Sequence, residues 1–201
     1  MITAFGGSSV DGTAYLDVVA VAQHAPTWLD AAVSFWSTYG LAVFPLLAVL
    51  GWWLARRGGD AAAVRALAVP VVAVVAYGVD ALTKLAVRED RPCQSLRVKT
   101  LETCPAPGDW SFPSNHAAIA AAAAVALLFV SRRLGAVAAV AALAMAVSRV
   151  WVGVHYPHDV LAGVLVGALV AVTAMLALRR WSRSLARWIG SGRLGRLLSA
   201  T

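Results

Sequence analysis

Residues 113–131 read PSNHAAIAAAAAVALLFVS, a short polar head followed by an almost unbroken run of small apolar residues. After His116 the run contains no charge, glycine or proline, and alanine and leucine are among the strongest helix formers. It comes close to the length that a helix needs to cross the hydrocarbon core of a bilayer, about 20 residues. This stretch therefore predicts a membrane helix that carries polar side chains at its first turn.

Four more apolar stretches accompany this one, at about 31–55, 61–87, 134–152 and 159–178. Of the 201 residues, 60% are hydrophobic and only 13% are charged. Soluble domains carry about 25% charged residues, so a soluble fold is excluded. We expect an all-α fold, an integral membrane helical bundle of about five transmembrane helices that form one domain over residues 31–180.

The two ends of the chain are predicted to lie at membrane surfaces. Residues 1–30 form an N-terminal interfacial segment that lacks the basic start and compact apolar core of a secretory signal. Within it, residues 13–23 have the spacing of a short interfacial helix. Residues 181–201 interleave arginine with Trp, Leu and Ile, which suits a cytoplasmic helix lying against anionic lipid; a frayed basic tail is the alternative. The membrane accounts for the formal net charge of +7, so we expect no nucleic-acid partner.

Basic residues are divided unequally between the two faces of this bundle. Eleven of the 17 Lys and Arg residues fall at 56–65, at 131–133 or after residue 178, where Asp60 is the only acid. The positive-inside rule puts these segments in the cytoplasm. The other basic residues then lie toward the extracytoplasmic face of the inner (plasma) membrane of a bacterium, the source that the bias toward alanine, valine and arginine indicates.

Cys93 and Cys104 are the two cysteines of the chain, and both fall in the long loop predicted on the extracytoplasmic side. Disulfides persist in that environment. A bridge would close a loop of about a dozen residues and destabilise the unfolded chain by roughly 3 kcal/mol. Two unpaired thiols are the alternative. We expect no metal, because neither cysteine has a second ligand at zinc spacing.

Three groups of polar residues interrupt the apolar helices on the extracytoplasmic side, and their members suit phosphate binding. Lys84 and Arg91 flank the end of one helix, and Arg149 lies near the end of another. An arginine fork can bind two phosphate oxygens, while lysine supplies a point charge. Ser114 and Asn115 open the alanine-rich helix, whose first free amides point toward an anion.

Two histidines and an aspartate add the groups that cleave a phosphate ester. His116, at a helix start, can donate a proton to a leaving oxygen. Asp159 lies four residues after His155, so its carboxylate can accept the Nδ1 proton and leave Nε2 free as a nucleophile. This set predicts phosphoryl transfer through an imidazole.

Several of these residues also have simpler explanations. Lys84 and Arg91 could extend to lipid headgroups, and Ser114 could be an ordinary N-cap. Asp80, one turn before Lys84, is interpreted as a neutralising charge outside the active set. His158 has no carboxylate at the spacing of the other histidine and is interpreted as interfacial or structural.

The same residues resemble the motifs of the type 2 phosphatidic acid phosphatases, a family of membrane lipid-phosphate phosphatases. Residues 84–92 match K-x-x-x-x-x-x-R-P, and residues 148–159 match S-R-x-x-x-x-x-H-x-x-x-D. Residues 113–116 resemble P-S-G-H, with Asn115 where glycine is usual. That position contributes mainly a backbone amide, so asparagine should be tolerated. Three linked motifs over residues 84–159 are far more specific than any one alone.

The resemblance implies a two-step hydrolysis that needs no metal or other cofactor. His155 would attack phosphorus and form a phosphohistidine, while His116 would act first as an acid and then as a base. The phosphate oxygens would be held by Lys84, Arg91, Arg149, Ser114 and the amide of Asn115.

The compact chain and its amphipathic start resemble the polyprenyl-diphosphate phosphatases within this family. The expected substrate is undecaprenyl or decaprenyl diphosphate, converted to the monophosphate for recycling of the cell-wall carrier. Alternatives are a phosphatase for phosphatidic acid, phosphatidylglycerol phosphate or a polyprenyl-linked sugar phosphate, and a protein that binds or transports the carrier lipid. The chain shows no obvious inverted repeat, which disfavours transport. The motifs recognise phosphate and leave the lipid tail and the oligomeric state open.

Overall fold

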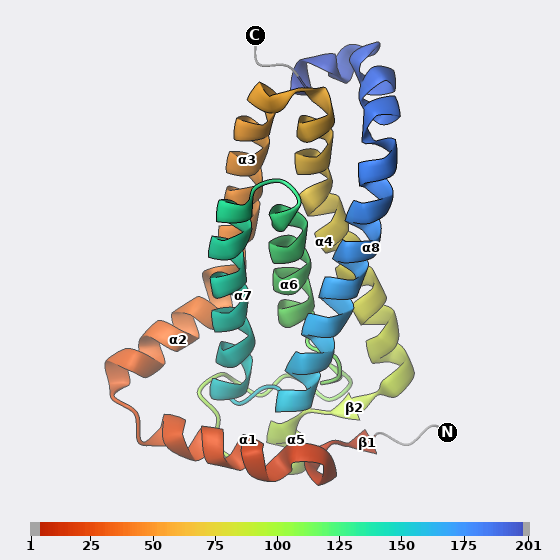
Figure 1. Cartoon of the computed structure of the whole chain (residues 1–201). Coiled ribbons are helices and arrows are strands. Elements are labelled where there is room, and N and C mark those ends of the chain that lie inside the picture. Colours follow the sequence, from red (N-terminus) through yellow and green to blue (C-terminus); the bar gives the residue numbers. More distant parts are fainter. Residues whose placement is uncertain (1–4, 199–201) are drawn as a thin grey trace.

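The computed structural model describes residues 5–198, and helices make up most of them. Five helices run together along the length of the molecule (Figure 1). They are α3 (Val43–Ala55), α4 (Asp60–Val87), α6 (Asn115–Leu128), α7 (Arg132–Trp151) and α8 (Pro157–Gly190). Helix α6 lies in the middle and contacts α4, α7 and α8.

Four segments of the described residues are long and apolar enough to cross a membrane: Thr27–Gly58, Asp60–Val87, Arg132–Trp151 and Pro157–Gly190. Helix α6 is apolar but has only 14 residues. At 1.5 Å per residue it is about 21 Å long, shorter than a hydrocarbon core of about 30 Å. The prediction of an all-α integral membrane bundle is confirmed, and its central helix is shorter than α4, α7 and α8 beside it.

The first apolar stretch, expected as one helix over 31–55, is divided in two. Helix α2 (Thr27–Tyr39) ends at a 3₁₀ turn, η1 (Gly40–Ala42), after which α3 begins. A Cβ added to Gly40 would lie 2.9 Å from the side chain of Met145, so glycine lets the backbone pass close to α7 at the break. Helix α2 consequently leaves the bundle at an angle (Figure 1).

Helices α6 and α8 approach each other closely because α8 presents glycines to α6. A Cβ on Gly163 would lie 2.5 Å from the carbonyl oxygen of Ser114, and one on Gly167 would overlap the carbonyl of Ala118. Small residues permit this kind of backbone approach between membrane helices. The contact fixes the start of α8 beside the start of α6.

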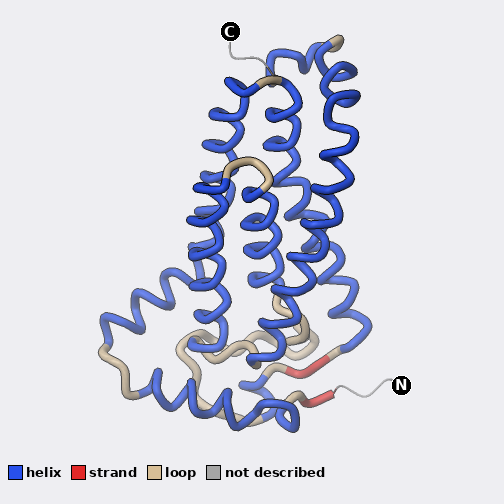
Figure 2. Tube along the Cα trace, in the orientation of Figure 1, coloured by secondary structure: helices blue, strands red, loops and turns tan. Residues whose placement is uncertain are grey.

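One end of the bundle, called the loop end below, carries both strands and the longest loop (Figure 2). Strand β1 (Phe5–Gly6) pairs in parallel with β2 (Glu89–Asp90), which follows α4. The one-turn helix α5 (Pro92–Ser95) comes next, and residues 96–114 are non-helical. A disulfide joins Cys93 of α5 to Cys104 of this loop.

Helix α1 (Ser8–Gln23) lies across the loop end (Figure 1) and begins earlier than the predicted interfacial helix over 13–23. Tyr15 is fully buried, its ring centre lies 5.4 Å from that of Tyr156, and its hydroxyl donates a 2.9 Å hydrogen bond to the carbonyl of Gly153. Helix α1 is therefore packed onto the bundle through the turn between α7 and α8.

The opposite end, called the far end, holds the last turns of α8 and the 3₁₀ turns η2 (Arg56–Gly58) and η3 (Arg193–Leu197). Helix α8 continues through residue 181 to residue 190, so the first part of the predicted basic tail is helical. Residues 1–4 of the N-terminal segment and residues 199–201 of the tail lie outside the described residues.

Candidate active site

The three predicted groups of polar residues are brought together at the loop end. They come from the end of α4 and the segment after it, from the start of α6, and from the end of α7 through the start of α8. All are buried or half-buried: Lys84, Arg91, Ser114, Asn115, His116, Arg149, His155 and Asp159. Burying so many ionisable groups in a membrane protein is costly and is typical of a functional site.

His155 lies in the turn between α7 and α8, and Asp159 lies in the first turn of α8. The Oδ2 atom of Asp159 is 3.3 Å from Nδ1 of His155. The same oxygen accepts the backbone N–H of Tyr156 at 2.8 Å and the hydroxyl of Ser111, whose Oγ is 3.4 Å from His155 Nδ1. Asp159 thus caps α8 and orients the imidazole at the same time.

Arg91 determines which ring nitrogen of His155 carries the proton. Nη1 of Arg91 lies 3.0 Å from Nε2 of His155. A guanidinium has only donors, so Nε2 must accept, and the proton of the neutral ring is on Nδ1, toward Asp159. Arg91 is itself held by the carbonyl of Val154 and by the carbonyl and carboxylate of Asp109, each at 3.0 Å. Nε2 therefore presents a lone pair.

The surroundings of His155 also oppose its protonation. The residue is 2% exposed, and this burial is the main reason that its pKa lies well below the ordinary value of 6.5. The nearby cations Arg91, Arg149 and Lys84 lower the pKa further. A neutral ring whose Nε2 carries a lone pair at physiological pH is what a nitrogen nucleophile requires, and here that lone pair accepts from Arg91.

Lys84 is buried and turned toward the loop, rather than extended to lipid headgroups. Its Nζ donates hydrogen bonds to the carbonyls of Trp110 at 2.6 Å and Ser111 at 3.2 Å. Asp80 makes no ion pair with it, and both carboxylate oxygens of Asp80 are buried without a hydrogen-bond partner among residues 5–198. Lys84 thus holds the segment that leads into α6, and Asp80 does not neutralise it by direct contact.

Ser114 occupies the N-cap position of α6, but its side chain does not cap the helix. Its backbone N–H donates to the carbonyl of Asp159 at 3.0 Å, while its Oγ is buried and has no partner in the described part of the chain. The neighbouring Asn115 has a buried side-chain oxygen in the same condition. His116 follows in the first turn of α6 and is half-buried.

Arg149 reaches the site from the last turn of α7. Its Nη1 donates to the hydroxyl of Ser37, on α2, and lies 3.3 Å from the carboxylate of Glu102, in the long loop. Its Nε is buried and, within residues 5–198, has no hydrogen-bond partner. The guanidinium is fixed at one nitrogen and free to bind at another.

The unpartnered groups of this site suit an anion with several oxygens. Ser114 Oγ and Arg149 Nε are buried donors on different helices, and buried donors in proteins are almost always bonded. A phosphoryl group offers acceptors to both, and the charges of Lys84 and Arg91 complement it. With the lone pair of His155 at the same place, the arrangement can bind a phosphate and attack its phosphorus.

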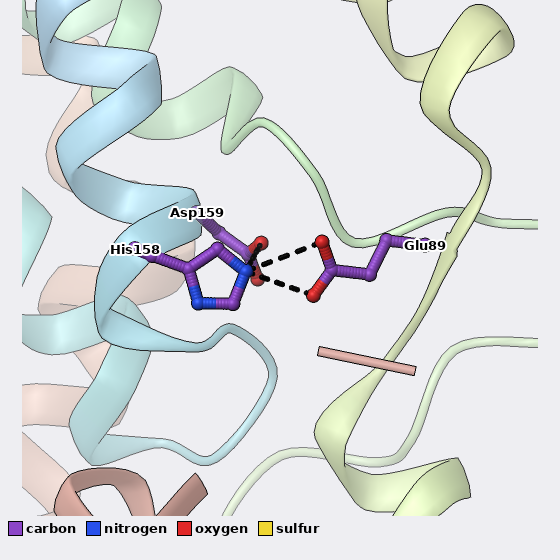
Figure 3. A group of neighbouring side chains, drawn as sticks. All are labelled: Glu89, His158 and Asp159. Carbon is purple, nitrogen blue, oxygen red and sulfur yellow. Dashed lines mark hydrogen bonds and ion pairs between the residues drawn. The ribbon is translucent and has the colours of Figure 1, made fainter. Parts of the chain in front are cut away.

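A second cluster adjoins the site and contains His158 (Figure 3). Nε2 of His158 lies 2.9 Å from Oε1 of Glu89 and 3.5 Å from Oδ1 of Asp159, and Nδ1 lies 2.7 Å from Oδ1 of Asp11. Carboxylates at both ring nitrogens suit a ring with two protons. His158 therefore links α1, β2 and α8 beneath the site, in agreement with its interpretation as structural.

The prediction that the site uses no metal stays a prediction. Ligand atoms of Glu89, His158 and Asp159 lie within 4.8 Å of one another, a group that could hold a cation. Both nitrogens of His158 already face carboxylates, so a metal would have to displace the contact with Glu89.

Five supporting residues of the site were not predicted from the sequence. They are Asp11, Ser37, Glu89, Glu102 and Ser111. An isolated serine or acid in a loop or amphipathic helix is ordinary, so nothing in the sequence singles out Asp11, Ser37, Glu102 or Ser111. Glu89 could have been found, because an acid two residues before a motif arginine in a membrane protein needs a partner.

Comparison with known proteins gives a consistent result. The family model of the PAP2 superfamily matches residues 62–183. Undecaprenyl-diphosphatase BcrC of Bacillus subtilis is 31% identical over 148 residues, which are 74% of this chain and 74% of that protein. Decaprenylphosphoryl-5-phosphoribose phosphatase of Mycobacterium tuberculosis is 40% identical over 99 residues, 49% of this chain and 52% of that protein.

The fold is similar to that of a solved structure as well. The crystal structure of Aquifex aeolicus LpxE aligns with a TM-score of 0.65 over 83% of this chain and 95% of that one. The two sequences are 21% identical, so this likeness concerns the fold alone.

Proposed function

The chain belongs to the PAP2 superfamily, and from the geometry of its site we propose that it converts a polyprenyl diphosphate to the monophosphate at the extracytoplasmic face of the membrane. Its family and its relatives identify it as a membrane lipid-phosphate phosphatase, which hydrolyses phosphoric esters. It is a bacterial protein that crosses the membrane several times. What we propose beyond this family membership is the substrate, the phosphohistidine intermediate and the side of the membrane on which the site lies.

The observation that carries the proposal is the state of His155. Its Nε2 is a neutral acceptor, aligned by Arg91 on one side and by Asp159 on the other. An imidazole held in this tautomer and kept unprotonated is a nitrogen nucleophile, and the buried cations around it select a phosphoryl group as its target.

In the first step, Nε2 of His155 forms a bond to the terminal phosphorus as the bond from phosphorus to the bridging oxygen breaks. The polyprenyl monophosphate leaves with a proton from His116. The ring gains positive charge during attack, which the carboxylate of Asp159 stabilises. Arg91, now 3.0 Å from Nε2, transfers that hydrogen bond to a phosphate oxygen when the substrate enters.

In the second step, water attacks the phosphohistidine in line. His116 accepts the proton of this water, the bond from nitrogen to phosphorus breaks, and inorganic phosphate leaves with His155 again neutral. In both steps the negative charge on the equatorial oxygens is stabilised by Lys84, Arg91, Arg149, Ser114 and the amide of Asn115.

A diphosphate is favoured as the substrate by the undecaprenyl-diphosphatase that matches three quarters of the chain. A second candidate is a polyprenyl-linked sugar phosphate, which the phosphoribose phosphatase from Mycobacterium tuberculosis favours at higher identity over half the chain. Both are phosphates on a polyprenyl carrier, and both suit recycling or maturation of cell-wall lipids.

The distribution of charge supports the proposed extracytoplasmic location. The loop end holds most of the acids and the disulfide, and the far end holds the arginine-rich segments. The positive-inside rule and the chemistry of disulfides both favour the loop end outside the cytoplasm.

The test is phosphate release by the purified protein in detergent with a chelator present. Farnesyl diphosphate, phosphatidic acid and a polyprenyl phosphosugar would be compared side by side. We expect the diphosphate to be hydrolysed fastest, and His155→Ala to release no phosphate. The matched control is His24→Ala, an exposed histidine at the end of α1, which should keep full activity. Full activity of the His155 variant would refute the nucleophile.

A further inference from the structure

A cavity of about 800 Å³ lies at the far end of the bundle, away from the active site. It is bounded by the start of α4, the end of α6 and the last turns of α8. Its lining combines arginines with two apolar side chains at the C-terminal end of α6: Arg65, Arg179, Arg180, Arg183, Leu128 and Phe129.

The cavity exists because α6 is too short to fill the bundle. Helix α6 ends at Leu128, whereas α4 and α8 extend well beyond that level (Figure 1). The chain then turns directly into α7 at Arg132. Helix α6 therefore fills the centre of the bundle at the loop end but does not reach the far end. Arginines line the space that is left there.

The position along α8 corresponds to the opposite surface of the membrane. Arg179 follows Asp159 of the active site by 20 residues along one continuous helix, a distance of about 30 Å at 1.5 Å per residue. That length equals the thickness of the hydrocarbon core. If the active site lies at one interface, the arginines of the cavity lie at the other, at the level of lipid headgroups.

The charge of the cavity has no internal counterpart. Among the described residues no acid lines it, and the guanidinium groups of the four lining arginines form no ion pair. Four cations that converge on a hollow repel one another, and an anion in the hollow relieves this repulsion. Leu128, 44% exposed, and Phe129 supply an apolar wall beside the charges.

We propose that this cavity is a binding site for a phosphate anion, filled in the membrane by the headgroup of an anionic phospholipid. The arginines bind the phosphate oxygens by charge-assisted hydrogen bonds, and the apolar wall of α6 contacts the start of the acyl chains. Such a lipid joins α4, α6 and α8 at the end where α6 leaves them unsupported, and so stabilises the bundle.

The experiment measures thermal unfolding of the full-length protein in neutral detergent, with phosphatidylglycerol, phosphatidylcholine or inorganic phosphate added. Phosphatidylglycerol should raise the Tm of the wild-type protein, and phosphatidylcholine should not. The double variant Arg179→Gln/Arg183→Gln should lose this response, because each substitution should weaken lipid binding about tenfold. Arg187→Gln, one turn further along α8 and outside the cavity, is the matched control and should respond as the wild type does.

Two further variants separate the possible outcomes. Ala61→Trp places a bulky side chain in the cavity while keeping every arginine, and it should also lose the response. Arg149→Gln removes a charge from the active site and leaves the cavity intact, so this variant should keep the Tm response to phosphatidylglycerol. A Tm shift with inorganic phosphate but none with phosphatidylglycerol, dependent on the same arginines, would assign the cavity to free phosphate and overturn the assignment to a lipid. An equal shift in the double variant and the wild type, or with phosphatidylcholine, would overturn the proposal.

Discussion

Replacing Asp159 by asparagine tests how the carboxylate supports His155. The asparagine side-chain oxygen can still accept the 2.8 Å hydrogen bond from the N–H of Tyr156, so α8 should remain capped and the protein folded. The negative charge next to Nδ1 of His155 is lost. We expect kcat for diphosphate hydrolysis to fall by about a thousandfold.

The magnitude follows from the distance between the two groups. A full charge on the ring and one on Oδ2, 3.3 Å apart, attract each other by about 5 kcal/mol at an effective dielectric constant of about 20. That energy corresponds to between three and four powers of ten in rate. Only part of the charge has developed at the transition state, which reduces the expected effect to about three powers of ten.

The assay is steady-state phosphate release from farnesyl diphosphate, with the Tm of each variant measured to verify folding. Asp109→Asn is the matched control, since Asp109 pairs with Arg91 but is 54% exposed, and a water-screened pair should cost less than about tenfold. If folded Asp159→Asn keeps kcat within threefold of the wild type, the electrostatic role of Asp159 is refuted.

Three further predictions concern packing, proton transfer and pH. Gly163→Ala should destabilise the bundle by about 1–3 kcal/mol, because its Cβ would lie 2.5 Å from the carbonyl of Ser114. Gly78→Ala, inside α4 with open space around it, is the control and should not lower the Tm, because alanine favours a helix more than glycine does. His116→Ala should slow hydrolysis of the monoester phosphatidic acid far more than that of farnesyl diphosphate. The leaving group of farnesyl diphosphate is a phosphate with a pKa near 6, which needs a proton less than the alkoxide that leaves phosphatidic acid. Equal losses in kcat would contradict the role of His116 as acid. The folded-state pKa of His155 lies below its unfolded value of 6.5, so below that pH the unfolded chain binds a proton that the folded protein excludes, and stability falls with falling pH. Between about pH 7.5 and 5.5 the wild type should lose about 1.4 kcal/mol more stability than His155→Gln, and equal losses would contradict the lowered pKa of His155.

The residues of the candidate site could be picked out from the sequence because their types and spacing are unusual in a membrane protein. Lys84, Arg91 and Arg149 stand out against apolar helices, and the spacing of four places Asp159 against His155 without further information. The membrane bundle was equally accessible, since it depends on composition and on the length of apolar runs.

The residues that contact the candidate site could not be predicted, because they become its neighbours only in the folded chain. Ser37 and Glu102 meet Arg149 from positions 112 and 47 residues away. The break before α3 that turns α2 toward this site depends on packing of Gly40 against α7, which no periodicity reveals. Ser111 and Asp11 likewise acquire their roles through tertiary contacts with Asp159 and His158.

The most direct test of the proposed chemistry is to trap the phosphorylated enzyme. Farnesyl diphosphate labelled in its terminal phosphate would be mixed with the protein, quenched in alkali and digested for mass spectrometry. We predict a phosphoryl group on His155, at a higher level in His116→Ala than in the wild type, because that variant lacks the base for the second step. Label on another residue, or turnover with no labelled protein, would contradict a mechanism in which His155 attacks phosphorus.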